Sequence, residues 1–147
     1  MYFYLDIEPK AQSRPRISTA NGYARAYEKA DIKKWKMTVA EMVIKQMVDN
    51  NWRKFMTGTA VAFSVAFSIP FPKSYSKKKR ADLDGVPHIQ KPDVDNYVKA
   101  LFDALTGVLW EDDNQVSYLS ATKAWGRKPC IIIYANEDTE RLTPVEF

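Results

Sequence analysis

Alternating apolar and polar side chains run through several short segments of the chain, which is the pattern of half-buried strands. The alternation is clearest between Val61 and Ile69. There, large apolar side chains face one way and only alanine and serine face the other, where a helix could pack closely. The predicted strands are residues 2–8, 59–69, 108–110, 115–125 and 130–135. Together they predict a sheet of about four to five strands.

Two longer segments space their apolar residues three or four positions apart, as one face of a helix does. The first covers residues 28–50. The second runs from Asp93 to Gly107, and that glycine suits the left-handed position after a helix end. A short helix is expected to begin in the basic run that precedes Gly85. The polar, proline-flanked residues 9–27 predict a loop that becomes ordered on binding.

This order of elements predicts one α+β domain over residues 1–147, with a mixed or antiparallel sheet, two main helices and a tail at residues 138–147. The composition of the 147 residues, 46% hydrophobic and 27% charged, is typical of a folded globular domain. The longest nearly apolar stretch, residues 60–71, is too short to span a bilayer, and no basic-then-apolar leader opens the chain.

One cysteine and one histidine limit the chemistry that the chain can carry. A single cysteine cannot form an internal disulfide or a thiolate zinc site, so a reducing cytoplasm is the expected location. A single histidine argues against multi-histidine metal sites, and the five scattered glycines form no phosphate-binding loop. Metal sites built on cysteine or histidine and glycine-rich nucleotide sites are therefore excluded.

The net charge of +4 hides a division along the chain. Residues 1–80 carry 16 basic and 6 acidic side chains, a balance of +10, whereas residues 81–147 carry 6 basic and 12 acidic ones, a balance of −6. A basic surface beside a cluster of carboxylates favours nucleic acid as a partner, although each basic run alone also fits an ordinary solvated surface. The basic residues expected to hold the DNA backbone are Lys10, Arg14, Arg16, Lys73, Lys77, Lys78, Lys79 and Arg80.

Two groups of carboxylates occupy the acidic half of the chain. Asp93 and Asp95 lie at a predicted helix start, where the change from extended to helical backbone lets side chains two positions apart converge. Residues 111–113 are three consecutive acids that follow the predicted strand 108–110. If that strand packs against the preceding helix, it returns these acids to the helix start.

A pocket formed by Asp93, Asp95 and either Asp113 or Asp112 would suit Mg²⁺, which prefers oxygen ligands and usually keeps several waters. Carboxylates packed together raise one another's pKa unless a cation neutralises them. A cluster of this kind without a metal ion would therefore be costly to the fold.

Each acidic group also has an ordinary structural interpretation. An aspartate at a helix start often only caps free backbone N–H groups. Lys99 lies one turn after Asp95 and one turn before Asp103, so the three residues form a helical stripe that could be an ion-pair network. Residues 111–114 could be a polar turn.

These residues resemble the RusA family of Holliday-junction resolvases, which is common in phages and prophages. The resemblance rests on residues 91–96 (KPDVDN), Lys99, residues 103–105 (DAL) and residues 112–116 (DDNQV), with an echo in the proline- and arginine-containing residues 9–16. It implies a homodimeric, Mg²⁺-dependent endonuclease, with Mn²⁺ as a possible substitute. Such an enzyme cuts four-way DNA junctions by paired, symmetric incisions in recombination and repair.

The roles known in the family fall on matching positions of this chain. The metal-binding catalytic carboxylates become Asp93, Asp95 and Asp113. Asp112 matches the neighbouring acid of the family's acidic pair, and Lys99 matches an essential basic residue. Because this chain has a third acid directly before that pair, the choice of metal ligand among the three consecutive acids stays open.

The expected reaction is metal-assisted hydrolysis of a phosphodiester, in which Lys99 stabilises the developing charge or positions the water. His88 lies five residues before Asp93 and has no evident partner, so a loop role is favoured. Two rival functions are a metal nuclease acting on other branched DNA and a non-catalytic nucleic-acid-binding module. In that module, bases would stack on aromatic side chains: Tyr23, Tyr27, Trp110 and Trp125.

Overall fold

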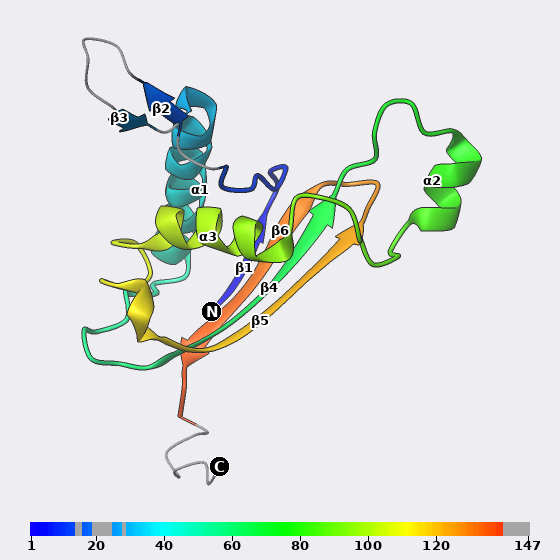
Figure 1. The fold of residues 1–147 in the computed structure, drawn as a ribbon. Coiled ribbons are helices and arrows are strands. Elements are labelled where there is room, and N and C mark those ends of the chain that lie inside the picture. Colours follow the sequence, from blue (N-terminus) through cyan, green and yellow to red (C-terminus); the bar gives the residue numbers. More distant parts are fainter. Residues whose placement is uncertain (14–15, 19–24, 28, 140–147) are drawn as a thin grey trace, which may run out of the picture.

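The computed structural model describes residues 1–13, 16–18, 25–27 and 29–139, and for residues 16–18 and 25–27 it describes the backbone alone. Its elements in chain order are β1 (Tyr2–Leu5), β2 (Arg16–Ser18), β3 (Arg25–Tyr27), α1 (Ala30–Asp49), β4 (Val61–Ile69), α2 (Lys77–Leu83), α3 (Val94–Leu105), the 3₁₀ helix η2 (Asp113–Gln115), β5 (Val116–Trp125) and β6 (Cys130–Glu137) (Figure 1). The prediction of one α+β domain is confirmed.

Four strands form one mixed sheet in the order β1–β6–β4–β5. Strand β6 pairs antiparallel with both β1 and β4, whereas β4 and β5 run parallel. A parallel pair needs a long crossover, and here the crossover carries both α2 and α3 (Figure 1). Both acidic groups, at residues 93–95 and 111–113, therefore lie on the connection between the two parallel strands.

Helices α1 and α3 contact each other and cover the same face of the sheet (Figure 1). They pack where β4 presents its large side chains, which are buried from Val61 to Ile69, while the alanines and serines between them are not. The prediction that a helix packs on the small-residue face is wrong. Large apolar side chains give a helix more surface to bury, and among the described residues no helix covers the opposite face.

The boundaries of the long elements agree with the sequence pattern to within two residues. The predicted helix 28–50 is α1, and the helix predicted to end at Gly107 is α3. Gly107 has a φ of +85°, the left-handed conformation expected after the helix. The first strand is shorter than predicted and ends at Leu5. No helix in the described part of the chain is long and apolar enough to cross a membrane.

Residues 108–110 form no strand, contrary to the prediction. A tight turn follows α3 instead, in which the Gly107 N–H donates to the Trp110 carbonyl at 2.7 Å. Trp110 is fully buried, and its ring packs edge-on against Phe63 and Phe102, with centroids 5.5 and 5.2 Å away. Burying this large side chain next to the helix end requires the chain to turn at once.

Two other predictions concern residues 9–27, which differ from the prediction, and residues 138–147, which are only partly described. Residues 9–27 were predicted as a loop, but they contain the antiparallel pair of β2 and β3. Short strands with few apolar residues give little periodic signal in a sequence. Of the predicted tail, residues 138–139 are described and residues 140–147 lie outside the described part of the chain.

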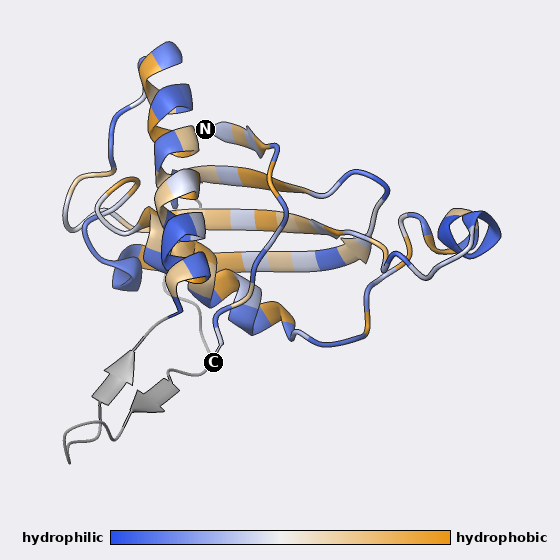
Figure 2. Ribbon diagram, turned by 90° about the horizontal axis from the view of Figure 1, so that it is seen from above, coloured by the Kyte–Doolittle hydropathy of each residue, from blue (hydrophilic) through white to orange (hydrophobic). Residues whose placement is uncertain are grey.

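Residues 72–84, called the basic arm below, lead away from the sheet and carry α2, the predicted short helix (Figure 1). Helix α2 has no buried residue, and Figure 2 shows it almost entirely in the hydrophilic colour. Hydrogen bonds between residues of the arm hold its conformation. The Ser76 hydroxyl accepts a capping hydrogen bond from the Lys79 N–H at 3.1 Å. The Arg80 guanidinium donates to the carbonyls of Tyr75, Pro72 and Lys73 at 3.0, 3.3 and 3.4 Å.

Candidate active site

Asp93 and Asp95 lie at the start of α3, and both residues are exposed. Asp93 occupies the N-cap position with extended backbone, yet its side chain accepts no capping hydrogen bond. Neither carboxylate has a hydrogen-bond or ion-pair partner among the described residues. The interpretation of Asp93 as a simple helix cap is therefore wrong, and both carboxylates are available to a ligand.

The loop that leads into Asp93 is held by a lysine that the sequence did not single out. Lys123 Nζ donates to the carbonyl oxygens of Gln90 at 2.5 Å and Pro92 at 2.7 Å. The Lys91–Pro92 peptide bond between these carbonyls is cis. The only signal for Lys123 is that it is the one charged residue in β5. Because one ammonium group binds both carbonyls, it fixes the backbone directly before Asp93.

A cavity of about 280 Å³ opens beside Asp93. One wall comes from the N-terminal loop, which is held against α3 by a hydrogen bond from the Gln12 N–H to the Asn96 carbonyl at 2.9 Å. The lining residues are Ala11, Gln12, Ser13, Lys91, Pro92, Asp93 and Asn96. Residues 11–13 thus border the first acidic group.

Lys99 lies one turn along α3 from Asp95, and its exposed ammonium group has no ion-pair partner among the described residues. The alternative of an ion-pair network along Asp95, Lys99 and Asp103 is therefore wrong. Asp103 pairs instead with Lys36 of α1 at 3.1 Å, and the Lys36 side chain is only 14% exposed. Lys36 is thus a second lysine beside the carboxylates of α3, after Lys99. The spacing of residues along the sequence could not reveal it. Within the described part of the chain, Lys99 therefore keeps an unpaired ammonium group that could bind a ligand.

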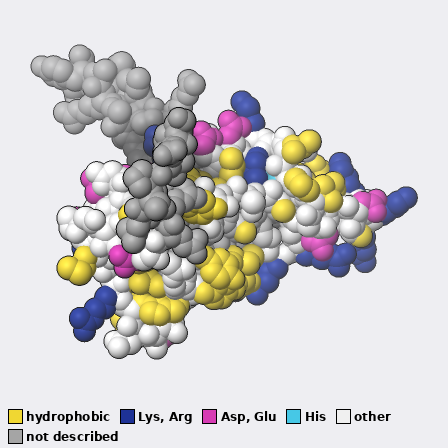
Figure 3. Space-filling model, turned by 90° about the horizontal axis from the view of Figure 1, so that it is seen from below, with side chains coloured by type: hydrophobic (Ala, Val, Ile, Leu, Met, Phe, Trp, Pro, Cys, Tyr) yellow, Lys and Arg dark blue, Asp and Glu magenta, His cyan; other side chains and the backbone are white. Residues whose placement is uncertain are grey.

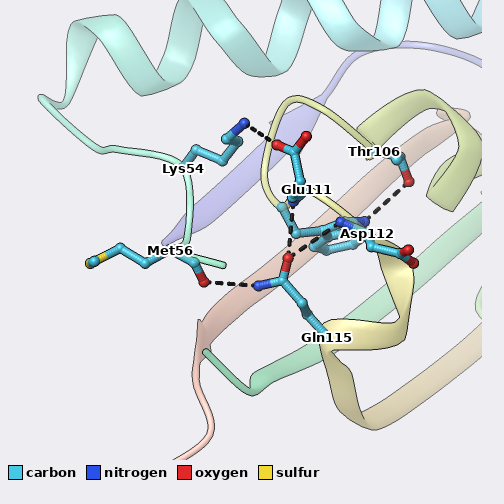
Figure 4. A network of polar contacts seen from close by, with 7 residues as sticks. Lys54, Met56, Thr106, Glu111, Asp112 and Gln115 are labelled. Atoms are coloured by element: carbon cyan, nitrogen blue, oxygen red, sulfur yellow. Dashed lines mark hydrogen bonds and ion pairs between the residues drawn. The ribbon is translucent and has the colours of Figure 1, made fainter. Parts of the chain in front are cut away.

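Two of the three consecutive acids are used by the fold (Figure 4). Glu111 pairs with Lys54 at 2.6 Å. Asp112 caps η2 in a capping box: its carboxylate accepts from the Asn114 N–H at 3.0 Å, and the Gln115 side chain accepts from the Asp112 N–H at 3.3 Å. The polar-turn interpretation thus holds for Glu111 and Asp112.

Asp113 differs from its two neighbours because no lysine, arginine or histidine of the described residues pairs with it. Partial burial raises the pKa of the Asp113 carboxyl, and the nearby charges of Asp112 and Asp103 raise it further. A carboxylate beside like charges gains most from a bound cation. Of the three consecutive acids, Asp113 is therefore the one that has neither a cationic partner nor a capping role among the described residues.

The two acidic groups do not meet in one pocket at the helix start. Among the described residues, no three histidine, cysteine, aspartate or glutamate side chains are placed to hold a metal ion together. Asp113 is influenced by Asp103, which lies eight residues after Asp95, or about 12 Å along the helix axis. The predicted return to the helix start required a strand at residues 108–110, and the turn at Trp110 replaces that strand.

The basic residues predicted to hold DNA differ in how the fold uses them. Lys73, Lys77 and Lys78 are exposed on the basic arm, and their ammonium groups have no partner among the described residues. Lys79 Nζ lies 3.8 Å from the centre of the Tyr75 ring. A cavity of about 720 Å³ borders the arm and is lined by Pro70, Phe71, Lys77, Arg80, Ala81 and Arg127.

The second basic group is only partly within the described residues. Lys10 pairs with Asp31 at 3.4 Å, and both side chains are largely exposed. Arg14 lies outside the described residues, and of Arg16 only the backbone, in β2, is described.

The aromatic residues required by a base-stacking module are mostly unsuitable. Trp110 and Trp125 are buried, with 0% and 6% exposure, so neither can stack on a base. Tyr23 lies outside the described residues, and the side chain of Tyr27 does too. His88 is also buried: its ring packs edge-on against Trp125 with centroids 4.4 Å apart.

Comparison with known proteins places this geometry in a family. Residues 6–134 match the family described as Endodeoxyribonuclease RusA. The chain belongs to the RusA endodeoxyribonuclease family. It is also 35% identical over 134 residues to YqaN of Bacillus subtilis (strain 168), an uncharacterized protein, and the similarity covers 88% of this chain and 91% of YqaN. RusA-family nucleases act on DNA and depend on a metal ion.

The donor chemistry of this RusA-family site fits a hard divalent cation. Mg²⁺ is commonly bound by one or two carboxylates together with waters and substrate phosphates, rather than by an all-protein cage. Asp93 and Asp95 supply two such carboxylates without a partner among the described residues, and Asp93 lines a cavity. The absence of a three-residue ligand set among the described residues is compatible with a metal ion whose remaining ligands are water and DNA.

Proposed function

We propose that this chain is a Mg²⁺-dependent endodeoxyribonuclease that resolves four-way DNA junctions, with Mn²⁺ as a possible substitute. In this proposal it acts in the cytoplasm as a homodimer and makes paired, symmetric incisions during recombination and repair. A two-fold dimer would present two equivalent sites to a junction that is itself roughly two-fold symmetric.

One observation carries the proposal: three exposed charged side chains at α3 have no hydrogen-bond or ion-pair partner among the residues that the structure describes. Asp93, Asp95 and Lys99 are the positions at which the RusA motif places catalysis, and none has a partner in the described structure. Acidic and basic groups on a helix surface usually pair or cap. That three of them have no partner among the described residues, while Asp103 pairs with Lys36, supports a role in binding.

The site residues would divide the reaction as follows. A bound Mg²⁺ would polarise a phosphate oxygen and lower the pKa of a water molecule. Asp93 and Asp95 would hold the ion, and Lys99 would stabilise the negative charge that develops on the phosphate. Asp113 would be the third carboxylate of the site. Asp112 would keep the turn at η2 in shape beside it.

The lysines of the basic arm would bind the DNA backbone. Lys73, Lys77 and Lys78 are favoured because no described residue neutralises their charges. Lys79 and Arg80 would contribute charge while maintaining the shape of the arm. Contacts of this kind position DNA without reading its sequence, and they weaken as salt is added.

A synthetic four-way junction labelled on one strand and incubated with Mg²⁺ or Mn²⁺ tests the proposal. The wild type is expected to cut, whereas Asp93→Asn should bind the junction equally well in a gel-shift assay and cut at least about 100-fold more slowly. Glu111→Gln is the matched control, because its carboxylate is already paired with Lys54. It should cut at nearly the wild-type rate. A wild type that binds junctions but cuts with neither metal would contradict the proposal.

Two further comparisons test whether Asp113 or Asp112 is the third carboxylate of the site, and which branched DNA is the substrate. Asp113→Asn should reduce cutting far more than Asp112→Asn does, provided that both variants keep the wild-type circular dichroism spectrum. Equal cutting of a flap, a three-way junction and a four-way junction would favour a general branched-DNA nuclease. Paired cuts at symmetric positions in opposite strands of the four-way junction are the result expected for a resolvase.

A further inference from the structure

Ile89 is the most exposed large hydrophobic side chain in the described part of the chain, with 91% of its surface accessible. It lies four residues before Asp93, in the loop of residues 85–92 that connects the basic arm to α3. A single exposed apolar side chain is ordinary on a protein surface and does not by itself indicate a function. Ile89 differs because the backbone around it is fixed, and because it lies between two groups that the proposed function assigns to DNA.

Loop 85–92 is held against β5 on both sides of Ile89. Before it, the His88 N–H donates to the Lys123 carbonyl at 3.1 Å, and the buried His88 ring packs edge-on against Trp125 with centroids 4.4 Å apart. After it, the Gln90 carbonyl accepts a hydrogen bond from Lys123 Nζ at 2.5 Å. These contacts fix the backbone of the loop without burying the Ile89 side chain. A side chain presented on a fixed backbone loses little conformational freedom when it meets a ligand.

The charges around this loop suit a polyanion. Residues 85–92 contain no acidic side chain, and Lys91 is exposed with no partner among the described residues. The lysines of the basic arm precede the loop, and seen from below, lysine and arginine side chains gather at the end of the molecule that carries this arm (Figure 3). Asp93 follows Ile89 by at most about 14 Å of extended chain, which is about four base steps of DNA. A strand whose phosphate reaches Asp93 would therefore pass close to Ile89.

We infer that Ile89 is an apolar wedge that inserts between neighbouring bases of the bound DNA at its branch point. The inference rests on the proposed function and deepens it, because it names a side chain that distinguishes branched from linear DNA. Isoleucine is one of the side chains that proteins insert between base steps, and the insertion unstacks the bases and kinks the DNA. Ile89 would contact the substrate without taking part in hydrolysis.

The balance of two free energies explains why such a wedge would select a branch point. Burying the Ile89 side chain between bases is favourable, since nearly all of its surface faces water in the free protein. Unstacking a base step of continuous duplex costs free energy of similar or larger size. At a branch point the strands exchange partners and stacking is already interrupted, so this cost falls. Insertion is then favourable at the branch point and unfavourable in linear duplex.

The fluorescence of 2-aminopurine, placed in turn at each position beside the branch point of a synthetic four-way junction, tests the inference. This base analogue fluoresces more strongly when it is unstacked, and EDTA in the buffer prevents cutting by the full chain. The wild type should raise the fluorescence on binding. Ile89→Ser should raise it little, and its preference for the junction over linear duplex should fall about 10-fold. Ile89→Leu keeps a large apolar side chain and should retain both effects.

Val48→Ser is the matched control. Val48 is 73% exposed on α1 and takes no part in the proposed site, so this variant should raise the fluorescence as the wild type does. Circular dichroism should be the same for all of these proteins, because a side chain as exposed as Ile89 supports no part of the core. A loss that appears in folded Ile89→Ser but not in Val48→Ser supports the wedge.

Three results would overturn the inference: no rise in fluorescence with the wild type, a rise of wild-type size with Ile89→Ser, or an equal rise in linear duplex labelled in the same way. Because no metal is present, the outcome is separate from that of the cleavage assay. A wild type that cuts junctions with Mg²⁺ but never raises the fluorescence would lose the wedge and keep the proposed function. A wild type that raises the fluorescence but cuts with neither metal would keep the wedge and lose the proposed nuclease.

Discussion

Replacing Lys123 with methionine keeps most of the side-chain length and removes the ammonium group that binds the carbonyls of Gln90 and Pro92. Both carbonyls then depend on water for hydrogen bonding, and the backbone before Asp93 loses its attachment to β5. We expect the variant to fold, because the buried core residues of β5 are unchanged. We also expect it to cut a four-way junction more slowly, because the two carboxylates at the start of α3 are positioned less well.

The magnitude follows from the two contacts. A hydrogen bond to a charged group contributes about 1.5–3 kcal/mol when it is shielded from water. Lys123 is partly exposed, so we expect about 1–2 kcal/mol for the pair together. That free energy corresponds to a factor of about 5–30 in the population of the ordered loop. Single-turnover cleavage should slow by a similar factor if the ordered loop is the active form.

Hydrogen exchange and a conservative variant separate positioning from a general loss of stability. In Lys123→Met, the amides of residues 88–97 should exchange faster, while those of β4 and β6 stay protected. Lys123→Arg keeps a cation that can donate to both carbonyls and should recover most of the cleavage rate. Unchanged exchange at residues 88–97 together with slow cleavage would refute the reasoning. So would a Lys123→Met variant that cuts at the wild-type rate.

Two further predictions concern pH and the basic arm. Burial, and then the charge of Lys123, lower the pKa of His88. The unfolded state therefore binds a proton more readily, so stability is full above the unfolded pKa of about 6.5 and falls as pH drops through the lower folded value. Between about pH 7 and about pH 5, the melting temperature should fall more for the wild type than for His88→Phe, and equal decreases would contradict the assignment. In the arm, Lys77→Ala should lower the slope of log affinity against log salt by about 1. Arg80→Ala should lose helical circular dichroism because three carbonyls lose their donor, and an unchanged spectrum would count against that role.

The elements that the sequence predicts well are those whose burial is periodic. Helices α1 and α3 and strand β4 each repeat their apolar residues at the spacing of one buried face, and burial is what fixes them in the structure. The segment 108–110 shows the limit of this reasoning. Leu109 and Trp110 are fully buried there, but the segment is a turn beside the large Trp110 ring and not the predicted strand. Over only three residues, hydrophobic periodicity cannot distinguish a short strand from a buried turn.

The candidate site shows a different limit. Asp93, Asp95 and Lys99 were found by motif and spacing, which are local along the chain. The contacts that decide which charges stay available are not local: Lys54 reaches Glu111 across 57 positions, Lys36 reaches Asp103 across 67, and Lys123 reaches Pro92 across 31. Partners this distant depend on how α1, β5 and the crossover pack together, and nothing in their spacing reveals them.

The position of Trp110 also has a consequence for metal binding in the proposed function. Because this ring is buried at the end of α3, Asp113 is influenced by Asp103 rather than by the carboxylates at the helix start. In the proposed function, a cation held by Asp93 and Asp95 would take its remaining ligands from water and from a phosphate of the bound DNA. DNA that supplies a ligand raises the affinity for the metal. By linkage, the metal raises the affinity for DNA by the same factor. The turn at Trp110 would thus couple the two binding events, so that the site is completed mainly when DNA is bound.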